Sequence, residues 1–167
     1  MIVMTLDTLI ALIALLVSVI ALGVSIWFWR KSFRPIVTAT VRTHFAGNEA
    51  IAYNLVFLNS GTIPAKNIVI KADEASLSLA LGSDATPENK KRWLACFSNE
   101  AQIPILQNGD RISCSFGTTK SNDAGFWRYK ATITVIIEYV GWFGREYRQE
   151  QQLRILDSDS FTGFMWA

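Results

Sequence analysis

Few side chains in this sequence have the types and spacing that catalysis or metal binding requires. His44 is the only histidine, and the two cysteines, Cys96 and Cys114, lie 18 positions apart with no Cys-x-x-Cys pair. A zinc site needs more ligands at local spacing, and a serine nucleophile would have to recruit His44 without a Gly-x-Ser-x-Gly turn. The sequence therefore predicts a protein that is not an enzyme, with no metal, no cofactor and two buried thiols.

The remaining polar groups favour turns and solvated surface. Gly141 to Gly144 is too short for a phosphate-binding loop and lacks its lysine. The one basic cluster, Lys90 to Arg92 beside Trp93, is interpreted as a solvated loop, with a contact to lipid headgroups or to an acidic partner as the alternative. After Arg34 the chain carries 13 Lys+Arg and 13 Asp+Glu, so the basic surface that nucleic-acid binding needs is missing. We expect neither a nucleic-acid partner nor a small-molecule substrate.

A long apolar run near the N-terminus precedes the rest of the chain and would determine where that part is held. Residues 8–29 contain no charge over 22 positions, and a helix of that length spans about 33 Å, close to the roughly 30 Å of a bilayer core. A buried core helix is one alternative, and a signal peptide cleaved near Gly23 is another. The N-terminal flank holds Asp7 and no basic residue, unlike a secretory signal. We predict one transmembrane helix, spanning about residues 7–29 within residues 1–31.

The flanks of this run predict its direction. The expected membrane-interface residues are Trp27, Trp29, Arg30, Lys31 and Arg34. Basic residues stay on the cytoplasmic side and aromatic rings lie at the headgroup boundary. We therefore expect a bacterial inner-membrane protein whose N-terminus is outside and whose C-terminal domain is cytoplasmic. The low cysteine count and the absence of Asn-x-Ser/Thr acceptors agree with this orientation.

Small residues recur along the apolar run at a spacing of three and four. They are Ala11, Ala14, Ser18, Ala21 and Ser25. In lipid, close backbone approach at small side chains is what favours helix association. This seam predicts packing against a second copy or against the helices of a larger partner, although small residues are also simply common in membrane helices.

The rest of the chain changes to a period of two, which is typical of strands. Strands are expected at residues 36–44, 51–59, 67–71, 75–81, 103–106, 111–116, 128–140 and 145–156. A short helix is expected from Thr86, with Pro87 at its first position. About eight short strands without helix-length crossovers indicate a mainly β protein, an antiparallel immunoglobulin-like β-sandwich over residues 32–156.

Two aromatic segments have two interpretations each. Trp142 and Phe143 lie at the tip of the last predicted hairpin, either folded back over the sandwich or in contact with a partner or the membrane. The tail, residues 157–167, ends with Phe161, Phe164, Met165 and Trp166. Such side chains are costly to leave in water, so we expect the tail to dock on its own domain or on a partner.

One stretch of the chain carries a resemblance. Arg34-Pro35 leads into the first strand, and the run from Phe57 to Ile70 has the pattern Asn-x-Gly-x-x-Pro-Ala-x-Asn, followed later by Leu106 to Gly109 and a closing hairpin from Tyr139 to Tyr147. In these features the chain resembles small uncharacterised bacterial single-pass membrane-anchored immunoglobulin-like β-sandwich proteins. These motifs form turns and strands, so the resemblance implies the fold and the anchor, not a reaction.

Together these features predict a non-catalytic accessory or scaffold subunit of a membrane protein complex. Its helix would pack in the bilayer and its β-sandwich would dock on the cytoplasmic face of the complex. The alternative is a self-associating membrane-anchored sensor that binds a ligand or a peptide, for example by adding a strand at an open sheet edge.

Overall fold

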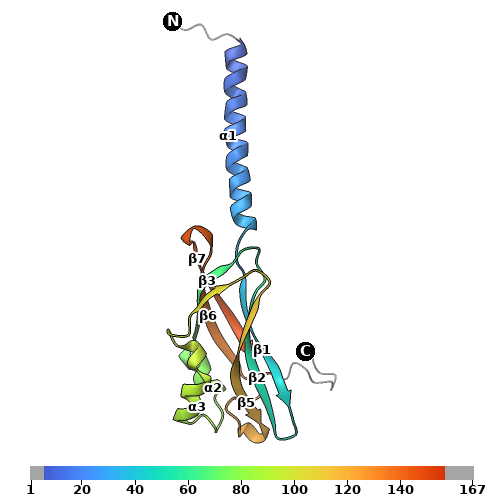
Figure 1. The fold of residues 1–167 in the computed structure, drawn as a ribbon, viewed down its shortest axis with the longest axis vertical. Helices are drawn as coiled ribbons and strands as arrows, with labels where there is room; N and C mark the ends of the chain where they lie inside the picture. Colours follow the sequence, from blue (N-terminus) through green and yellow to red (C-terminus); the bar gives the residue numbers. More distant parts are fainter. Residues whose placement is uncertain (1–5, 157–167) are drawn as a thin grey trace. The chain divides into compact units, whose positions relative to one another are not determined.

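The first unit of the chain is one long helix. The computed structural model describes residues 6–156 (Figure 1), and the chain divides into two compact units, residues 1–34 and 35–167. Helix α1 (Leu6–Ser32) begins with Asp7 in its first turn and ends with Arg30 and Lys31, charges that complement the helix dipole. None of its side chains is buried, and among the described residues it is the one helix long and apolar enough to cross a membrane.

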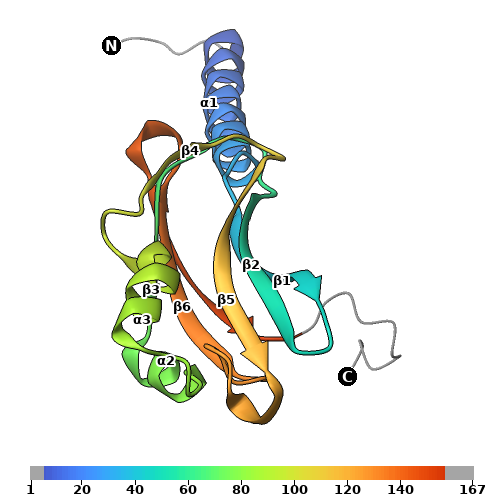
Figure 2. The ribbon, with the colours of Figure 1, turned by 60° about the horizontal axis from the view of Figure 1, so that its bottom comes forward.

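The second unit is built from antiparallel strands, which confirms the mainly β prediction. The strands are β1 (Val37–Ala46), β2 (Ala50–Asn59), β3 (Ala65–Ala72), β4 (Ile103–Leu106), β5 (Arg111–Lys120), β6 (Thr132–Val140) and β7 (Glu146–Arg154). They form two sheets among the described residues, in the orders β1-β2-β5 and β4-β3-β6-β7. Figure 2 shows β5 and β2 facing β3 and β6 across the core.

Alternating burial along the strands places the core between the sheets. On β6, Val135, Ile137 and Tyr139 are buried while the residues between them are half exposed. β7 pairs with β6 over nine residues, from Thr132 opposite Arg154 to Val140 opposite Glu146. Leu153 of this hairpin is buried on the same side, as the period of two predicts.

The prediction of a strand at residues 75–81 is wrong. This segment is helix α2 (Glu74–Ala80), whose first turn is closed by the Asp73 carboxylate accepting a hydrogen bond from the Ser76 N–H at 2.8 Å. This cap satisfies one of the N–H groups that have no partner within the helix at its start, and it also lowers the pKa of Asp73. Leu77 packs against the core whereas Leu79 is 72% exposed. The alternating leucines therefore lie on different faces of a helix and not on one face of a strand.

The short helix expected from Thr86 is confirmed. Helix α3 (Pro87–Trp93) has Pro87 at its first position, and the Thr86 hydroxyl accepts from the Asn89 N–H at 3.3 Å. A 3₁₀ turn, η1 (Ala95–Phe97), follows directly. Two further 3₁₀ turns are η2 (Ser121–Asp123) and η3 (Trp142–Gly144).

Strand β5 is longer than the sequence predicts and β6 is shorter. β5 continues past residue 116 because Gly117, with φ +79°, lets the strand change register against β2 and run on to Lys120. The start of the strand predicted at residues 128–140 is a turn, in which Lys130 takes φ +64°, and Trp127, just before this turn, is fully buried. The Trp127 indole N–H donates to the carbonyl of Phe116, so a core tryptophan fastens this turn to β5.

Asn59 ties three chain segments together. Its fully buried amide donates to the carbonyls of Ile63 (2.8 Å) and Leu106 (3.1 Å) and accepts from the N–H groups of Ile36 (3.2 Å) and Gly61 (3.0 Å). All the hydrogen-bonding capacity of its two N–H groups is used. Gly61 contributes to this network through its N–H, which donates to Asn59.

Candidate functional site

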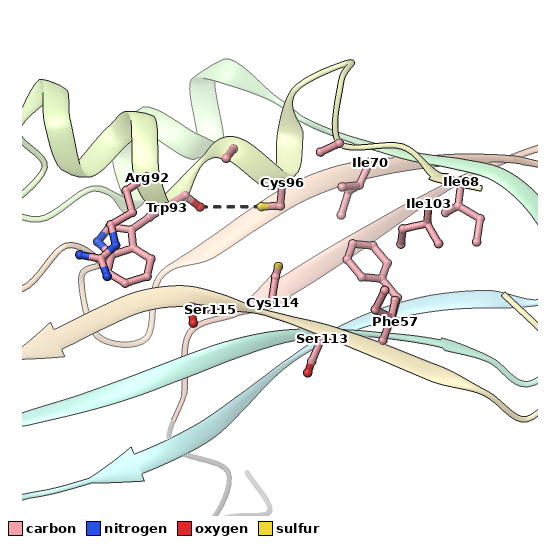
Figure 3. A pocket seen from close by; sticks show the side chains of 13 residues that line it. Phe57, Ile68, Ile70, Arg92, Trp93, Cys96, Ile103, Ser113, Cys114 and Ser115 are labelled. Atoms are coloured by element: carbon pink, nitrogen blue, oxygen red, sulfur yellow. Dashed lines mark hydrogen bonds between the residues drawn. The ribbon is translucent and has the colours of Figure 1, made fainter. Parts of the chain in front are cut away.

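The candidate site is an apolar cleft of about 280 Å³ on the side of the sandwich where β5 and β4 are the edge strands. Figure 3 shows it from close by. It is lined by Phe57, Ile68, Ile70, Arg92, Trp93, Ala95, Cys96, Ala101, Ile103, Ile112, Ser113, Cys114 and Ser115. The core residues among these form its floor, and α3 and η1 form one wall.

The floor of the cleft consists of core side chains that the sheets leave partly uncovered. Phe57 on β2 and Ile68 and Ile70 on β3 are buried. Ile112 lies directly opposite Phe57 in the β2–β5 ladder, so its side chain shares this face, yet it remains 46% exposed because β5 is the sheet edge. The cleft therefore presents aliphatic and aromatic surface to whatever enters it.

The wall from α3 carries the basic cluster identified in the sequence. We had interpreted Lys90 to Arg92 as a solvated loop, but these residues form the last turn of α3. The Arg92 guanidinium lies 4.5 Å from the ring centroid of Trp93, and both residues line the cleft. A positive charge thus stands at the rim of an apolar surface.

One side of β5 next to the cleft has no strand beside it. In an antiparallel ladder alternate residues direct their N–H and C=O groups to opposite sides. The Asp110 carbonyl accepts from the Asn59 N–H at 3.1 Å, toward β2, so Arg111 and Ser113 direct their backbone groups away from β2. Within residues 6–156 these outward groups have no hydrogen-bond partner.

The opposite side of the sandwich is closed by side chains. Gln151 on β7 accepts a hydrogen bond from the Ala39 N–H at 2.9 Å, and Gln149 donates to the carbonyl of Val37. These are the outward backbone groups in the first half of β1. The edge of β5 at the cleft has no such cover among the described residues.

The two cysteines predicted as buried thiols are half-buried and line this cleft. The Cys96 thiol donates to the Trp93 carbonyl, and the interaction between the two neighbouring cysteines raises the pKa of Cys96 and lowers that of Cys114. Burial also raises the pKa of Cys96. Among the described residues no group of three or more His, Cys, Asp or Glu side chains is placed to hold a metal, and His44 is exposed on β1.

The other residues singled out in the sequence lie outside the cleft. In α1 the hydroxyls of Ser18 and Ser25 donate to the carbonyls of Ala14 and Ala21, each at 2.8 Å, so they are satisfied within the helix. Lys31 lies 5.0 Å from the Trp27 ring. Trp142 in η3 is 44% exposed. The tail residues Phe161, Phe164, Met165 and Trp166 lie outside the described residues, and the side chain of Phe143 is not described.

Residues 2–159 match a protein family described as a domain of unknown function (DUF8453). The chain belongs to the DUF8453 family. The match includes α1 and every strand of the β domain, so in DUF8453 the apolar helix and the sheets are parts of one unit of sequence. A comparison with curated proteins finds no match.

Several residues that build this DUF8453 site were missed from the sequence. Arg111 and Ser113 carry no signal of their own, because their importance comes from where β5 lies in its sheet. Outside the cleft, Asn67 within β3, the last residue of the pattern Asn-x-Gly-x-x-Pro-Ala-x-Asn, has φ +52° at the point where the β3–β6 register shifts. An asparagine within a predicted strand is a usable signal for such a bulge.

Proposed function

We propose that this DUF8453 protein is a membrane-anchored, non-catalytic accessory or scaffold subunit. Its helix lies in the bilayer of a bacterial inner membrane, and its β domain binds an extended segment of a partner protein at the cleft beside β5. The protein contributes tethering and recognition to a larger membrane complex.

The exposure of α1 supports membrane insertion. Its 27 residues span about 40 Å, enough for a bilayer core and one interface. Almost every side chain is apolar and none is buried by the described part of the chain, so the helix needs an apolar environment from elsewhere. Trp27, Arg30 and Lys31 at its C-terminal end favour the orientation with the β domain in the cytoplasm.

The observation that carries the binding role is the unpaired edge of β5 next to an apolar cleft. Outward N–H and C=O groups on an edge strand form a template for another strand. Strand addition supplies main-chain hydrogen bonds, and a neighbouring pocket that takes alternate side chains supplies specificity. Ser113 provides outward main-chain groups for these hydrogen bonds, and the cleft below Ile112 provides the neighbouring pocket.

The residues around the cleft determine the chemistry of the partner segment. It is extended, it places a large apolar side chain on Phe57 and Ile103, and it carries an acidic residue that faces Arg92. Opposite charges of this kind fix the register and speed association more than they raise affinity.

We also infer an immunoglobulin-like topology for the β domain. Lettered A to G in chain order, the two sheets have the strand orders A-B-E and D-C-F-G. The constant-type immunoglobulin domain differs in that its D strand pairs with E. In this chain β4, which takes the place of D, pairs with β3, and this pairing leaves β5 as an edge.

Site-specific photo-crosslinking in the native membrane tests this function. With a photoreactive residue in place of Ser115 in the full chain, we expect adducts with one partner protein, and none from the exposed Gln152 on β7. Ser113→Pro removes the outward N–H and should abolish the adducts, whereas Ser113→Ala keeps that N–H and the adducts. Adducts that survive Ser113→Pro, or none at residue 115, contradict the proposal.

The small-residue seam of α1 favours a second candidate, a self-associating anchor. Ala14 and Ala21 leave room for close approach of another helix, and their carbonyls already accept from Ser18 and Ser25. If the adducts from residue 115 have the mass of two copies of this chain, self-association replaces the accessory subunit as the function.

A further inference from the structure

The two cysteines of this chain come from different elements and meet at the cleft. Cys96 lies in η1 and Cys114 in β5, and both line the same space. Figure 3 shows the Cys114 sulfur pointing from β5 toward the wall that carries Cys96, while the Cys96 sulfur is directed at the Trp93 carbonyl. Both side chains are half-buried, so small molecules that enter the cleft reach them.

Neighbouring contacts hold η1 against β5. Phe97, next to Cys96, packs edge-on against Phe116 with ring centroids 5.9 Å apart, and Phe116 is fully buried. The Cys96 Sγ lies 3.8 Å from the carbonyl oxygen of Trp93, which fixes the direction of that side chain. This packing keeps both sulfur atoms in the same cleft without any bond between them.

The environment of the pair gives the two thiols different reactivity. The interaction between the two cysteines lowers the pKa of Cys114 below its ordinary value, whereas this interaction and burial raise the pKa of Cys96. The thiolate is the nucleophile in disulfide exchange. Cys114 therefore attacks first, and Cys96 is placed to resolve the product.

We propose that Cys96 and Cys114 form a reversible dithiol–disulfide pair that reacts with low-molecular-weight disulfides. The Cys114 thiolate attacks one sulfur of the small disulfide, whose S–S bond breaks, and the leaving thiolate takes a proton from water. Cys96 then loses its proton to water and attacks the Cys114 sulfur, which releases the second small thiol. Two protein thiols are oxidised and one small disulfide is reduced to two thiols.

The new bond joins η1 to β5 across the mouth of the cleft. In the oxidised protein the wall formed by η1 is fixed on the edge strand, and access to Phe57 and Ile103 is reduced. The effect on partner binding rests on the proposed function, but the chemistry itself does not. A test on the purified chain therefore separates failure of this inference from failure of the proposed function.

The test uses the full reduced chain in detergent micelles, incubated with oxidised glutathione at neutral pH. We expect the intact mass to fall by about 2 Da, the loss of two hydrogens, and peptide mapping to find Cys96 linked to Cys114 within one chain. Dithiothreitol should restore the original mass. Stable glutathione adducts on the wild-type chain, a link between two chains, or no reaction at all would overturn the proposal.

Single substitutions test the order of the two steps. Cys96→Ala should stop the reaction at one glutathione adduct on Cys114, because nothing resolves it. Cys114→Ala, or Cys114→Ser if the alanine variant does not fold, should react at least tenfold more slowly at Cys96. Tryptophan emission like that of the wild type shows that each variant is folded. Equal rates in the Cys96 and Cys114 variants would contradict the assigned roles.

Discussion

Replacing Asn59 tests how much one buried amide stabilises this domain. Asn59→Ala leaves the Gly61 N–H and the carbonyls of Ile63 and Leu106 without their partner in a buried site. We expect a loss of about 3 kcal/mol in the free energy of unfolding. Guanidinium unfolding of the full chain in micelles, followed by tryptophan fluorescence, measures it. Gln152→Ala, at an exposed position, is the control and should change stability by less than about 0.5 kcal/mol.

The lowered pKa of Cys114 predicts a pH-dependent reactivity. A thiol with a lowered pKa is a larger fraction thiolate at neutral pH, so Cys114 should be alkylated by iodoacetamide faster than Cys96 between pH 7 and 8. Cys96→Ala removes the interaction that lowers the pKa of Cys114 and should shift the rate profile of Cys114 to higher pH. Peptide mass spectrometry of timed samples gives both rates, and an unshifted profile would contradict the assigned cause.

For single residues, the sequence indicated which side chains would matter but not which other residues they would contact. It predicted two buried thiols, and it contains no signal that brings Cys96 to the same cleft as Cys114, because that proximity depends on where α3 and η1 return to β5. Trp127 was likewise not identified as a core residue, since it lies in a turn and not in a periodic strand.

Substitutions at two glycines with the same backbone φ distinguish the cost of backbone strain from the cost of steric contact. Gly117 and Gly109 both have φ +79°, but a Cβ on Gly117 would lie 2.9 Å from Phe126 and one on Gly109 would meet nothing within 4 Å. Gly109→Ala should cost about 1 kcal/mol, the conformational part alone. Gly117→Ala should cost at least about 2 kcal/mol, because overpacking adds to it. The same unfolding experiment compares the two, and equal losses would show that Phe126 moves away freely.

The seam on α1 predicts the effect of added bulk in the membrane. Ala14→Leu together with Ala21→Leu should weaken association of the full chain in native membranes, since leucine prevents close backbone approach. Leu16→Phe, which adds bulk away from the seam, is the control. Native gel electrophoresis after gentle extraction measures the fraction assembled, and unchanged assembly in the double variant would count against the seam.

Strands were predictable from the sequence where the alternation of apolar and polar residues extended over several positions. β1, β2, β4 and β7 lie within two or three residues of their expected bounds because one face of each strand is buried. α2 was misassigned because leucines at every second position fit a strand and a single turn of helix alike, and the Asp73 cap decided the outcome. The open edge of β5 was not predictable, because strand order depends on contacts between distant parts of the chain.

The proposed orientation of the whole molecule across the membrane leads to a further prediction. In a chain without Cys96 and Cys114, a single cysteine in place of the exposed Gln152 should resist a membrane-impermeant maleimide in intact cells and react after permeabilisation. A cysteine in place of Thr8, near the other end of α1, reports on the opposite side as a control. Labelling of residue 152 in intact cells would reverse the orientation that Arg30 and Lys31 favour.

The glutamines that cover the first half of β1 limit how large an assembly of these domains becomes. A chain of domains joined edge to edge grows only while each member that is added offers another unpaired edge. Gln149 and Gln151 occupy the outward groups of Val37 and Ala39, so growth in that direction is stopped. If β5 recruits a guest strand as proposed, the first half of β1 does not offer the next domain a second template. At the high local density of the proposed membrane anchor, this cover works against polymerisation into fibres through that part of β1.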